Sequence, residues 1–375
     1  MDFDFTEDQQ ALRDAVRRFV DKDYSFERRS QIERSGGFDR AAWEGLAGLG
    51  LTALAVPEAH GGLGFGAVEG MVVMEELGRG LVLEPLAQGA LIAPALLQRA
   101  PDDLQAAWLP RMAAGEALVV LAHQEARSRY RLQQVATRVV DGKLTGVKSL
   151  VPAGDVADAF IVPARVAGSD DAPHGVALYL VERAAAGVHT RPYSLYDGSR
   201  AAEVHFKDTP AQLIAGPDQG LALLELAADI GIAAQAAEAV GAMERYLEMT
   251  VDYLNTRKQF GVAIASFQAL RHRTADVKMQ LELARSMSYY ATLRLGDVAA
   301  VRRRAVSQAK VQLGQSMRFV GQQCTQMHGG IGVTDEYAGS HYFKRLTVME
   351  MQWGDTLHHL GEVSARMQDT AGVFA

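Results

Sequence analysis

The stretch from Leu254 to Val277 reads LNTRKQFGVAIASFQALRHRTADV and joins two of three long helical patterns in the chain. Apolar residues recur with helical spacing from Leu221 to Leu254, from Phe267 to Leu295 and again from Val301 to Met327. Helices of this length are stabilised mainly by packing their apolar faces side by side. Residues 214–375 are therefore predicted to form an antiparallel four-helix bundle.

The first part of the chain, residues 1–116, is also helical by pattern. Thr6 followed by Gln9 predicts a capping box at the start of one helix, and Asp39 can cap a second helix that carries Trp43. The segment GLTALAVPEAHGGLGFG, residues 50–66, contains one proline and several glycines that interrupt any regular element. It is predicted to be a loop between helices.

The middle part, residues 117–213, has a different residue pattern. Short runs rich in valine alternate with turn residues, and five of them have the length of a strand: LVVLAH, KLTGVKSLV, AFIVPARV, VALYLVE and AAEVHF. A small β-barrel or sandwich is predicted here. The whole chain is thus expected to be an α+β protein with a helical domain, a β-domain and a helical-bundle domain in that order.

Composition excludes several classes of protein. The chain has 375 residues, 48% of them hydrophobic and 22% charged, which is enough for two or three packed units. Its formal net charge of −7 offers no basic surface for nucleic acid. The single cysteine, Cys324, excludes an intramolecular disulfide and a cysteine-cluster metal site.

The N-terminus and the most apolar segments indicate where in the cell the protein is located. The N-terminus reads MDFDFTEDQQ and lacks the apolar stretch of a secretory signal. The most apolar windows, residues 81–97 and 221–243, are interrupted by acidic and amide side chains, so they are interpreted as buried helices. We expect no membrane association and a cytoplasmic location.

Three motifs together resemble the acyl-CoA dehydrogenase family. Residues 254–277 match the family signature "RxxFG … FQ … H … AD", residues 326–337 (QMHGGIGVTDEY) resemble "QxxGGxGxtxEY", and residues 56–64 (VPEAHGGLG) resemble "PExxGGxG". The matching positions in the first motif are Arg257, Phe260, Gly261, Phe267, Gln268, His272, Ala275 and Asp276. The resemblance implies the predicted domain order and the cofactor FAD.

The resemblance also implies the residues that hold FAD, and their chemistry suits a pyrophosphate. An arginine offers a planar fork of donors to phosphate oxygens, and in the family the arginine at the position of Arg257 contacts the FAD of a neighbouring subunit. Paired glycines allow a ligand to approach main-chain N–H groups closely. The implied set is Arg257, Phe260, Gln268, Gln326, Gly329, Gly330 and Thr356.

Simpler structural interpretations of the same residues stay open. Arg257 can pair with an aspartate on a neighbouring helix, and Phe260 can be a packing residue. Gly329 and Gly330 can simply end a helix. His272 is interpreted as structural.

The sequence departs from the family at the catalytic base. The family removes a thioester α-proton with a carboxylate, in most members the glutamate of a "YEGT" motif, while hydride passes to the flavin. A gap-free alignment places Trp353 to Thr356 on this motif and Gly354 at the glutamate, and the alternative base position on the long helix falls on Gly231. The nearest carboxylates are Asp355, Asp229 and Glu350.

Asp355 is the candidate base that we single out, because it neighbours the missing glutamate and precedes the retained Thr356. The competing interpretation is that Asp355 caps a closing helix that starts near Thr356.

The middle domain departs as well. Where the family has "TEPxAGSD", residues 124–131 read QEARSRYR, which keeps Glu125 but replaces a flavin-contacting threonine by Gln124. Pro152 replaces a second flavin-side hydroxyl. The added arginines 127, 129 and 131 can meet an acidic acyl tail or CoA phosphates, or can belong to a solvated loop. Within the family, EARSRY and the N-terminal decapeptide most resemble the small subunit of pimeloyl-CoA dehydrogenase.

Three functions follow as hypotheses. The first is an FAD-dependent acyl-CoA dehydrogenase that passes electrons to an electron-transferring flavoprotein. The second is a catalytically silent subunit that completes the cofactor site of a different chain. The third is a flavin monooxygenase or a relative of nitroalkane oxidase on the same scaffold, which no motif specifically supports. A homodimer or tetramer is expected, with an unlike acyl-CoA dehydrogenase subunit as the alternative partner.

Overall fold

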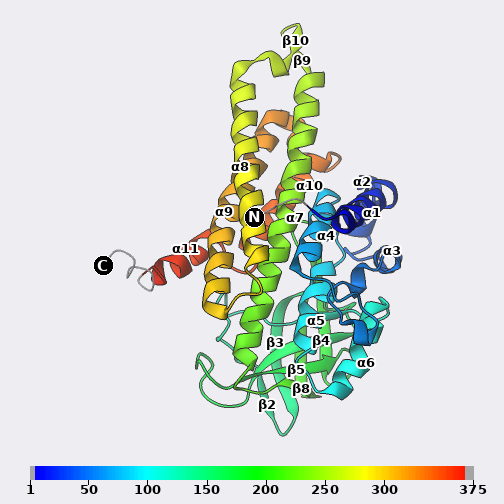
Figure 1. The fold of residues 1–375 in the computed structure, drawn as a ribbon, viewed down its shortest axis with the longest axis vertical. Coiled ribbons are helices and arrows are strands. Elements are labelled where there is room, and N and C mark those ends of the chain that lie inside the picture. The colour runs from blue at the N-terminus through cyan, green and yellow to red at the C-terminus, as the bar shows by residue number, and fades with distance from the viewer. Residues whose placement is uncertain (1–4, 368–375) are drawn as a thin grey trace. The chain divides into compact units, whose positions relative to one another are not determined.

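The computed structural model describes residues 5–367 (Figure 1). The first part of the chain forms helices. The first four residues, on which part of the N-terminal interpretation rested, lie outside the described range. The N-terminal helices are α1 Glu7–Asp23, α2 Phe26–Arg34, α3 Arg40–Gly48, α4 Ala67–Arg79, α5 Ala93–Leu97 and α6 Asp102–Ala113. Short helical turns separate them: η1 Leu51–Ala53, η2 Glu58–His60 and the π-helical η3 Ala87–Ile92.

Local sequence signals set the starts of two of these helices. The Thr6 hydroxyl accepts a hydrogen bond from the Gln9 N–H while the Gln9 side chain accepts one from the Thr6 N–H, so the predicted capping box is confirmed. Asp39 caps α3 by accepting from the Ala41 N–H at 3.1 Å, as predicted.

Strands follow the helices and form one mostly antiparallel sheet. They are β1 Val119–Leu121, β2 Arg138–Val140, β3 Lys143–Pro152, β4 Ala159–Arg165, β5 Val176–Glu182, β6 Val188–Ser194, β7 Arg200–Pro210 and β8 Gln212–Ala215. The strand order is β6-β7-β3-β2-β4-β5-β8, with β1 paired in parallel to β4. The apolar pattern predicted β1, β3, β4, β5 and β7. It missed the short β2 and β8 and the largely exposed β6, whose polar sequence carries no alternation.

The chain then returns to helices. These elements are α7 Gly220–Thr256, the hairpin strands β9 Lys258–Gln259 and β10 Val262–Ala263, η4 Ile264–Ser266, α8 Gln268–Leu293, α9 Ala299–His328, η5 Gly329–Val333, α10 Ala338–Met351 and α11 Thr356–Ala365. The predicted α+β fold with helical, β and helical segments is confirmed.

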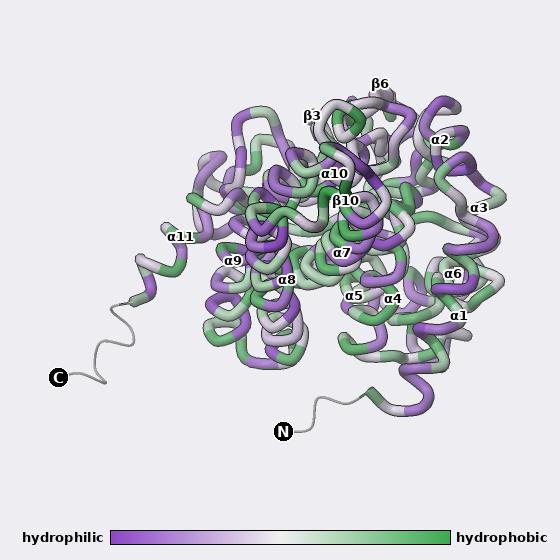
Figure 2. The backbone as a smooth tube through the Cα atoms, turned by 90° about the horizontal axis from the view of Figure 1, so that it is seen from above, coloured by the Kyte–Doolittle hydropathy of each residue, from purple (hydrophilic) through white to green (hydrophobic). Residues whose placement is uncertain are grey.

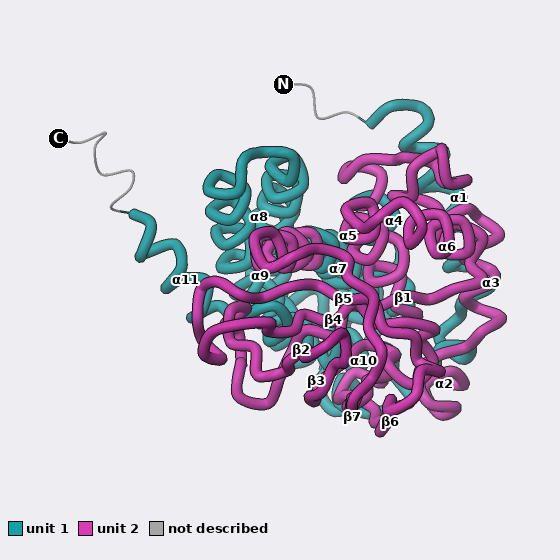
Figure 3. Tube along the Cα trace, turned by 90° about the horizontal axis from the view of Figure 1, so that it is seen from below, with its two compact units in different colours: residues 1–29, 71–82, 232–375 teal, residues 30–70, 83–231 magenta. Residues whose placement is uncertain are grey.

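The chain groups into two compact units that cut across these segments (Figure 3). Unit 1 contains residues 1–29, 71–82 and 232–375, and unit 2 contains residues 30–70 and 83–231. The sheet belongs to unit 2, and α8 to α11 belong to unit 1. The boundaries at residues 116 and 213 mark changes of element type, and as domain boundaries they stay a prediction.

The core of unit 1 is built around α7, which is drawn mainly in green and pale shades in Figure 2. Gly78 of α4 faces the backbone of Glu238, and Gly241 of α7 faces the backbone of Glu75. A Cβ at either glycine would overlap that backbone, so the two helices approach more closely than any other residue type allows. By length and composition α7 could cross a membrane, yet 67% of its most apolar window is buried inside the structure, as in a core helix.

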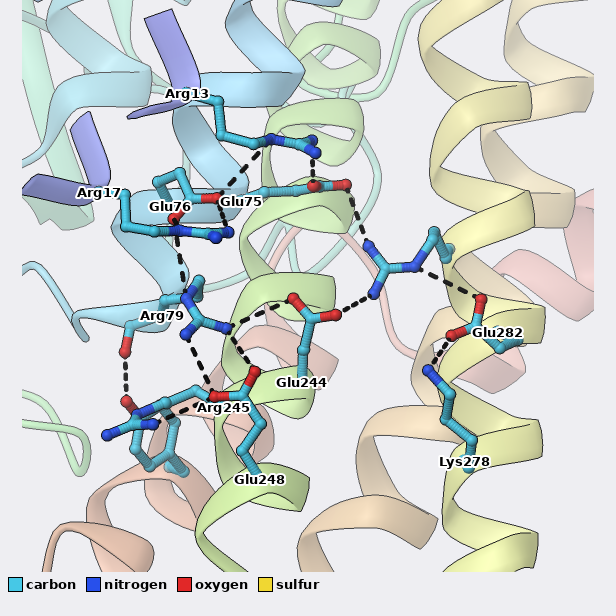
Figure 4. Close-up of polar contacts among 12 residues, drawn as sticks. Arg13, Arg17, Glu75, Glu76, Arg79, Glu244, Arg245, Glu248, Lys278 and Glu282 are labelled. Atoms are coloured by element: carbon cyan, nitrogen blue, oxygen red, sulfur yellow. Dashed lines mark hydrogen bonds and ion pairs between the residues drawn. The ribbon is translucent and has the colours of Figure 1, made fainter. Parts of the chain in front are cut away.

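An ion-pair network ties α1, α4, α7 and α8 of unit 1 together (Figure 4). Arg17 binds Glu76 through two hydrogen bonds of 2.9 and 2.7 Å. Arg79 binds Glu248 in the same bidentate way at 3.0 and 3.1 Å, and its own carbonyl accepts a hydrogen bond from the Tyr342 hydroxyl. Planar bidentate pairs fix geometry as well as charge, so the network sets how the N-terminal helix docks on the bundle.

Glu75 is, with Glu76, one of the two buried acids of this network. Arg13 donates to it at 2.8 Å and Arg285 lies 3.8 Å from its other oxygen. Burial raises the pKa of Glu75 to about 7, although both arginines act in the opposite direction.

Candidate functional site

Apart from Thr356, the predicted cofactor residues lie at one end of the unit 1 bundle. Arg257 follows α7 directly and its N–H still donates to the Tyr253 carbonyl at 2.8 Å. The hairpin β9–β10 turns through Phe260 and Gly261, which have φ of 54° and 80°. Two successive positive φ angles match the tight turns that suit a two-residue hairpin loop.

Phe260 is the most exposed large apolar residue in the described chain. Its side chain is 91% exposed, and its ring meets Phe267 edge-on with centroids 6.1 Å apart. Phe260 therefore packs little within the described part of its own chain, and its role as a packing or cofactor residue stays a prediction. Its ring is open to a ligand or to another subunit.

Gln268 begins α8 and Gln326 lies in the last turn of α9, and both are exposed. Contacts between the two helices place these ends together: Arg273 donates to the Gln323 side chain at 3.3 Å, and the Thr274 hydroxyl lies 3.6 Å from the Met327 sulfur. The end of α7, the start of α8 and the end of α9 are therefore neighbours.

Gly329 and Gly330 follow α9 and are both exposed. Gly329 has φ 65° and ψ −140°, a conformation almost confined to glycine, and its N–H closes the last turn of α9 on the Gln326 carbonyl. A Cβ at either position would meet no atom within 4 Å. Gly329 does end the helix, as the simpler interpretation held, and open space also remains above both backbones.

His328 connects this glycine loop to the end that carries Arg257. The His328 ring is buried and lies 4.8 Å from the ring of Tyr253, whose carbonyl accepts the hydrogen bond from the Arg257 N–H. His328 carries no signal in the sequence, because the motif leaves its position undefined. We call Arg257, Gln268, Gln326, Gly329 and Gly330 together the glycine-loop end.

The position of the missing glutamate lies in the turn between α10 and α11, residues 352–356, well away from the β9–β10 hairpin in Figure 1. Trp353 and Gly354 both have positive φ, 60° and 110°. Asp355 is the N-cap of α11 and accepts from the His358 N–H at 2.8 Å. The capping interpretation of Asp355 is confirmed, and its role as a base stays a prediction.

The other groups of the turn are engaged inward. The Thr356 hydroxyl donates to Glu350 at 2.8 Å and the Thr356 N–H donates to the same oxygen at 3.1 Å. A Cβ at Gly354 would lie 2.6 Å from atoms of both His358 and His359. No side chain fits there without a shift, so a glutamate cannot simply be restored at this position.

One face of α9 holds this turn through Ser307, Lys310 and Gly314. The fully buried Lys310 ammonium donates to the Gln235 side chain at 2.7 Å and to the Met349 carbonyl at 2.6 Å. Gln235 in turn donates to Gln352 at 2.7 Å. Burial lowers the pKa of Lys310 to about 7, although two nearby carboxylates act in the opposite direction.

His359 of α11 completes the hold on the turn. Its Nε2 lies 2.9 Å from the Trp353 carbonyl, so this nitrogen carries the proton and donates, while Nδ1 accepts from the Ser307 hydroxyl at 3.2 Å. Burial lowers the pKa of His359 to about 3. Gly314 faces the Thr356 hydroxyl, where a Cβ would overlap it.

In unit 2, Glu125 anchors the loop that replaces the family's flavin-side turn. It accepts hydrogen bonds from the N–H groups of Ala136 and Thr137, from the Thr137 hydroxyl and from the buried Lys148 ammonium at 2.7 Å. Burial opposes ionisation of Glu125, but Lys148 and these hydrogen bonds hold its pKa below the ordinary value. Glu125 is thus structural, and the arginines 127, 129 and 131 extend from its loop into solvent.

The other two carboxylates that the sequence offers as candidate bases are both buried. Asp229 is buried in α7, and Glu350 binds Thr356 and lies 3.7 Å from Arg318. Within residues 5–367, no group of three or more His, Cys, Asp or Glu could hold a metal ion.

Comparisons with known proteins agree with this architecture. Residues 6–116 match the N-terminal domain model of the acyl-CoA dehydrogenases and residues 218–368 match the C-terminal domain model. The acyl-CoA dehydrogenase IpdE2 of Mycobacterium tuberculosis is 31% identical over 342 residues, which cover 90% of this chain and 91% of that protein.

Two solved structures share the fold. The ChsE4–ChsE5 complex from Mycobacterium tuberculosis contains a chain that is 26% identical with a TM-score of 0.89, covering 98% of this chain and 99% of that chain. The FAD complex of PigA matches with a TM-score of 0.89 at 22% identity over 98% and 99% of the two chains. The fold is that of an oxidoreductase flavoprotein. The chain belongs to the acyl-CoA dehydrogenase family.

The residues present fit FAD unequally. At the glycine-loop end, an exposed arginine, two exposed glutamines and an unobstructed backbone at Gly329 and Gly330 suit the oxygens of a pyrophosphate. At the α10–α11 turn, the Thr356 hydroxyl donates to Glu350. In the β-domain, Pro152 pairs with Ala201 in the sheet and has no hydroxyl. The glycine-loop end fits the cofactor, whereas Pro152 offers no hydroxyl to a flavin ring and Thr356 already donates its hydroxyl hydrogen to Glu350.

Proposed function

We propose that this chain takes part in FAD-dependent α,β-dehydrogenation of acyl-CoA thioesters as a subunit of a hetero-oligomer, in which an unlike acyl-CoA dehydrogenase subunit supplies the α-proton base. When bound, FAD would accept the hydride from the β-carbon. The residues of this chain would bind and orient the cofactor from the glycine-loop end.

The α10–α11 turn carries this proposal. Proton removal next to a thioester needs a carboxylate within hydrogen-bond reach of the α-carbon. Asp355 caps α11, Glu350 holds Thr356, and Gly354 has no room for a side chain. Each acidic group at or beside the turn is thus engaged in building it.

Two further observations support a partner chain. Phe260 is almost fully exposed beside Arg257, the residue that the family uses across a subunit boundary. A chain of the ChsE4–ChsE5 complex, which contains two kinds of subunit, shares the fold at 26% identity. Electrons would leave through an electron-transferring flavoprotein, and a cytoplasmic location is part of the proposal.

Flavin spectroscopy under anaerobic conditions tests the proposal. We expect the isolated full-length chain to show no loss of flavin absorbance when straight-chain or dicarboxylic acyl-CoA thioesters are added. The complex with its unlike subunit should bleach. Bleaching of the isolated chain at catalytic rates would overturn the two-subunit proposal and would return the reaction to this chain alone.

The second candidate is a self-sufficient dehydrogenase, a homodimer or tetramer, that uses Asp355 as its base. The observation in its favour is that Asp355 is only half-buried and lies close enough to Lys310 to oppose, together with Glu350, the lowering of that lysine's pKa by burial. The narrower resemblance to the small subunit of pimeloyl-CoA dehydrogenase stays a prediction, and dicarboxylic acyl-CoA thioesters are included among the substrates above to test it.

A further inference from the structure

The glycine loop, residues 329–336, is closed at its base by a side-chain hydrogen bond. His328 is the last residue of α9 and Tyr337 directly precedes α10, and the Tyr337 hydroxyl lies 2.8 Å from His328 Nε2. Nine positions separate the two residues in the chain. The bond therefore joins the two ends of the loop that carries Gly329 and Gly330.

The direction of this bond is fixed by the other ring nitrogen. His328 Nδ1 lies 2.8 Å from the Cys324 carbonyl, which can only accept, so Nδ1 carries the proton. In the neutral ring Nε2 is then an acceptor, and the Tyr337 hydroxyl donates to it. Burial lowers the pKa of His328, although the backbone of Cys324 and Met249 acts in the opposite direction, and this lowering favours the neutral ring.

Aromatic packing leaves the His328 ring little freedom. It stacks on Tyr246 at 5.8 Å with an interplanar angle of 17° and lies 4.8 Å from Tyr253. The Tyr246 hydroxyl is itself 2.8 Å from the Thr325 hydroxyl. The acceptor nitrogen is thus held in one place by two helices.

A second histidine holds the far side of the loop. His341 of α10 lies 2.9 Å from the Asp335 carbonyl through Nε2, which therefore donates, while Nδ1 accepts from Arg29 at 2.9 Å. Lys344 binds the Asp335 carboxylate at 2.6 Å. The exposed glycines lie between these two anchors.

We propose that His328 and Tyr337 form a clamp that fixes the glycine loop in one conformation and so preorganises its main-chain N–H groups for the phosphates of FAD. His328 is a positioning residue, since its ring is buried and both of its nitrogens bind groups of the protein. The cofactor part of the inference rests on the proposed function. The fixing of the loop does not.

Tyr337→Phe tests the clamp, because it removes the donor and keeps the ring. Tyr253→Phe is the matched control: it removes a hydroxyl from the same aromatic cluster without touching the His328 bond. Hydrogen–deuterium exchange of the full-length chain should show faster exchange of residues 329–336 in Tyr337→Phe than in the wild type or the control. Unchanged exchange in Tyr337→Phe would overturn the clamp.

Titration of FAD into the same apoproteins gives the second readout. One lost hydrogen bond corresponds to about two- to tenfold weaker binding in Tyr337→Phe, with the control unchanged. Faster exchange with undiminished FAD affinity would overturn the role in preorganisation. If the wild-type chain and its complex bind no FAD, the proposed function fails, and exchange alone decides whether the clamp exists.

Discussion

Gly329 and Gly330 are adjacent and both exposed, but they differ in backbone conformation. Gly329 has φ 65° and ψ −140°, whereas Gly330 has no positive φ and open space above its Cα. Gly329→Ala is expected to lower the free energy of unfolding by about 1–3 kcal/mol through backbone strain. Gly330→Ala should change it by less than about 0.5 kcal/mol.

The same pair separates folding from cofactor binding. Gly330→Ala should weaken FAD binding about tenfold, because its methyl group occupies the space through which a phosphate approaches the backbone. Urea denaturation and FAD titration of both variants check this. Full FAD affinity in Gly330→Ala would remove Gly330 from the cofactor site.

Asp355 caps α11 in the structure, and it is also predicted to act as the catalytic base. Asp355→Ala should cost about 1 kcal/mol of stability, and Asp355→Asn less, because asparagine still accepts from the His358 N–H. If another chain supplies the base, neither variant slows flavin reduction in the complex. A loss of about 10²-fold or more in Asp355→Asn, measured by stopped-flow bleaching, would instead assign the proton transfer to Asp355.

At the scale of elements, Lys310 joins α9 to α7 and to the end of α10. The pKa of Lys310 falls from 10.5 to about 7 in the folded chain, so between these values the unfolded chain binds more protons. The stability linked to Lys310 is therefore fully present above pH 10.5 and is lost as the pH falls through 7.

Lys310→Met should flatten this rise of the free energy of unfolding between pH 7 and 10. Denaturant titrations across that range check the slope, with Lys278→Met on the exposed face of α8 as the control. Equal slopes in the wild type and Lys310→Met would show that the buried lysine stays charged in this range.

Glu75, in the network between α1, α4 and α8, is a buried acid whose pKa is shifted by burial, as that of Lys310 is (Figure 4). Its folded pKa is raised from 4.5 to about 7, so the stability linked to Glu75 is full below pH 4.5 and is lost as the pH rises through 7. Glu75→Gln should remove that loss, and the exposed Glu44→Gln should not. Thermal unfolding at pH 5 and pH 8 measures the difference, and an unaltered pH effect in Glu75→Gln would contradict the assignment.

At the scale of the whole molecule, assembly is predicted to cover the β9–β10 hairpin. We expect light scattering to give a mass above the 40.5 kDa of one chain, and Phe260→Asp to shift it toward that value. The folded chain should lose no stability, because Phe260 is 91% exposed. Val140→Asp, at another exposed apolar position, on β2, is the control. An unchanged mass in Phe260→Asp would place the interface elsewhere.

Much of the architecture could be predicted because its causes are local. The Thr6 and Asp39 caps act over two or three residues, and alternating or helical apolar patterns mark most elements without knowledge of their partners. The edge strand β6 was missed because its side chains face solvent and carry no apolar alternation. Motif spacing likewise indicated the family and the residues of the glycine-loop end.

The sequence by itself therefore determined the class of fold, the family and the absence of a glutamate from the usual base position. Only the tertiary structure decided which side chains are available, since this depends on residues far apart in the chain. It committed Asp355 to a helix cap, turned Thr356 toward Glu350, and placed His328 between Tyr253 and Tyr337. A motif records residue types and spacings, whereas hydrogen bonds and burial form only when the path of the chain brings the partners together.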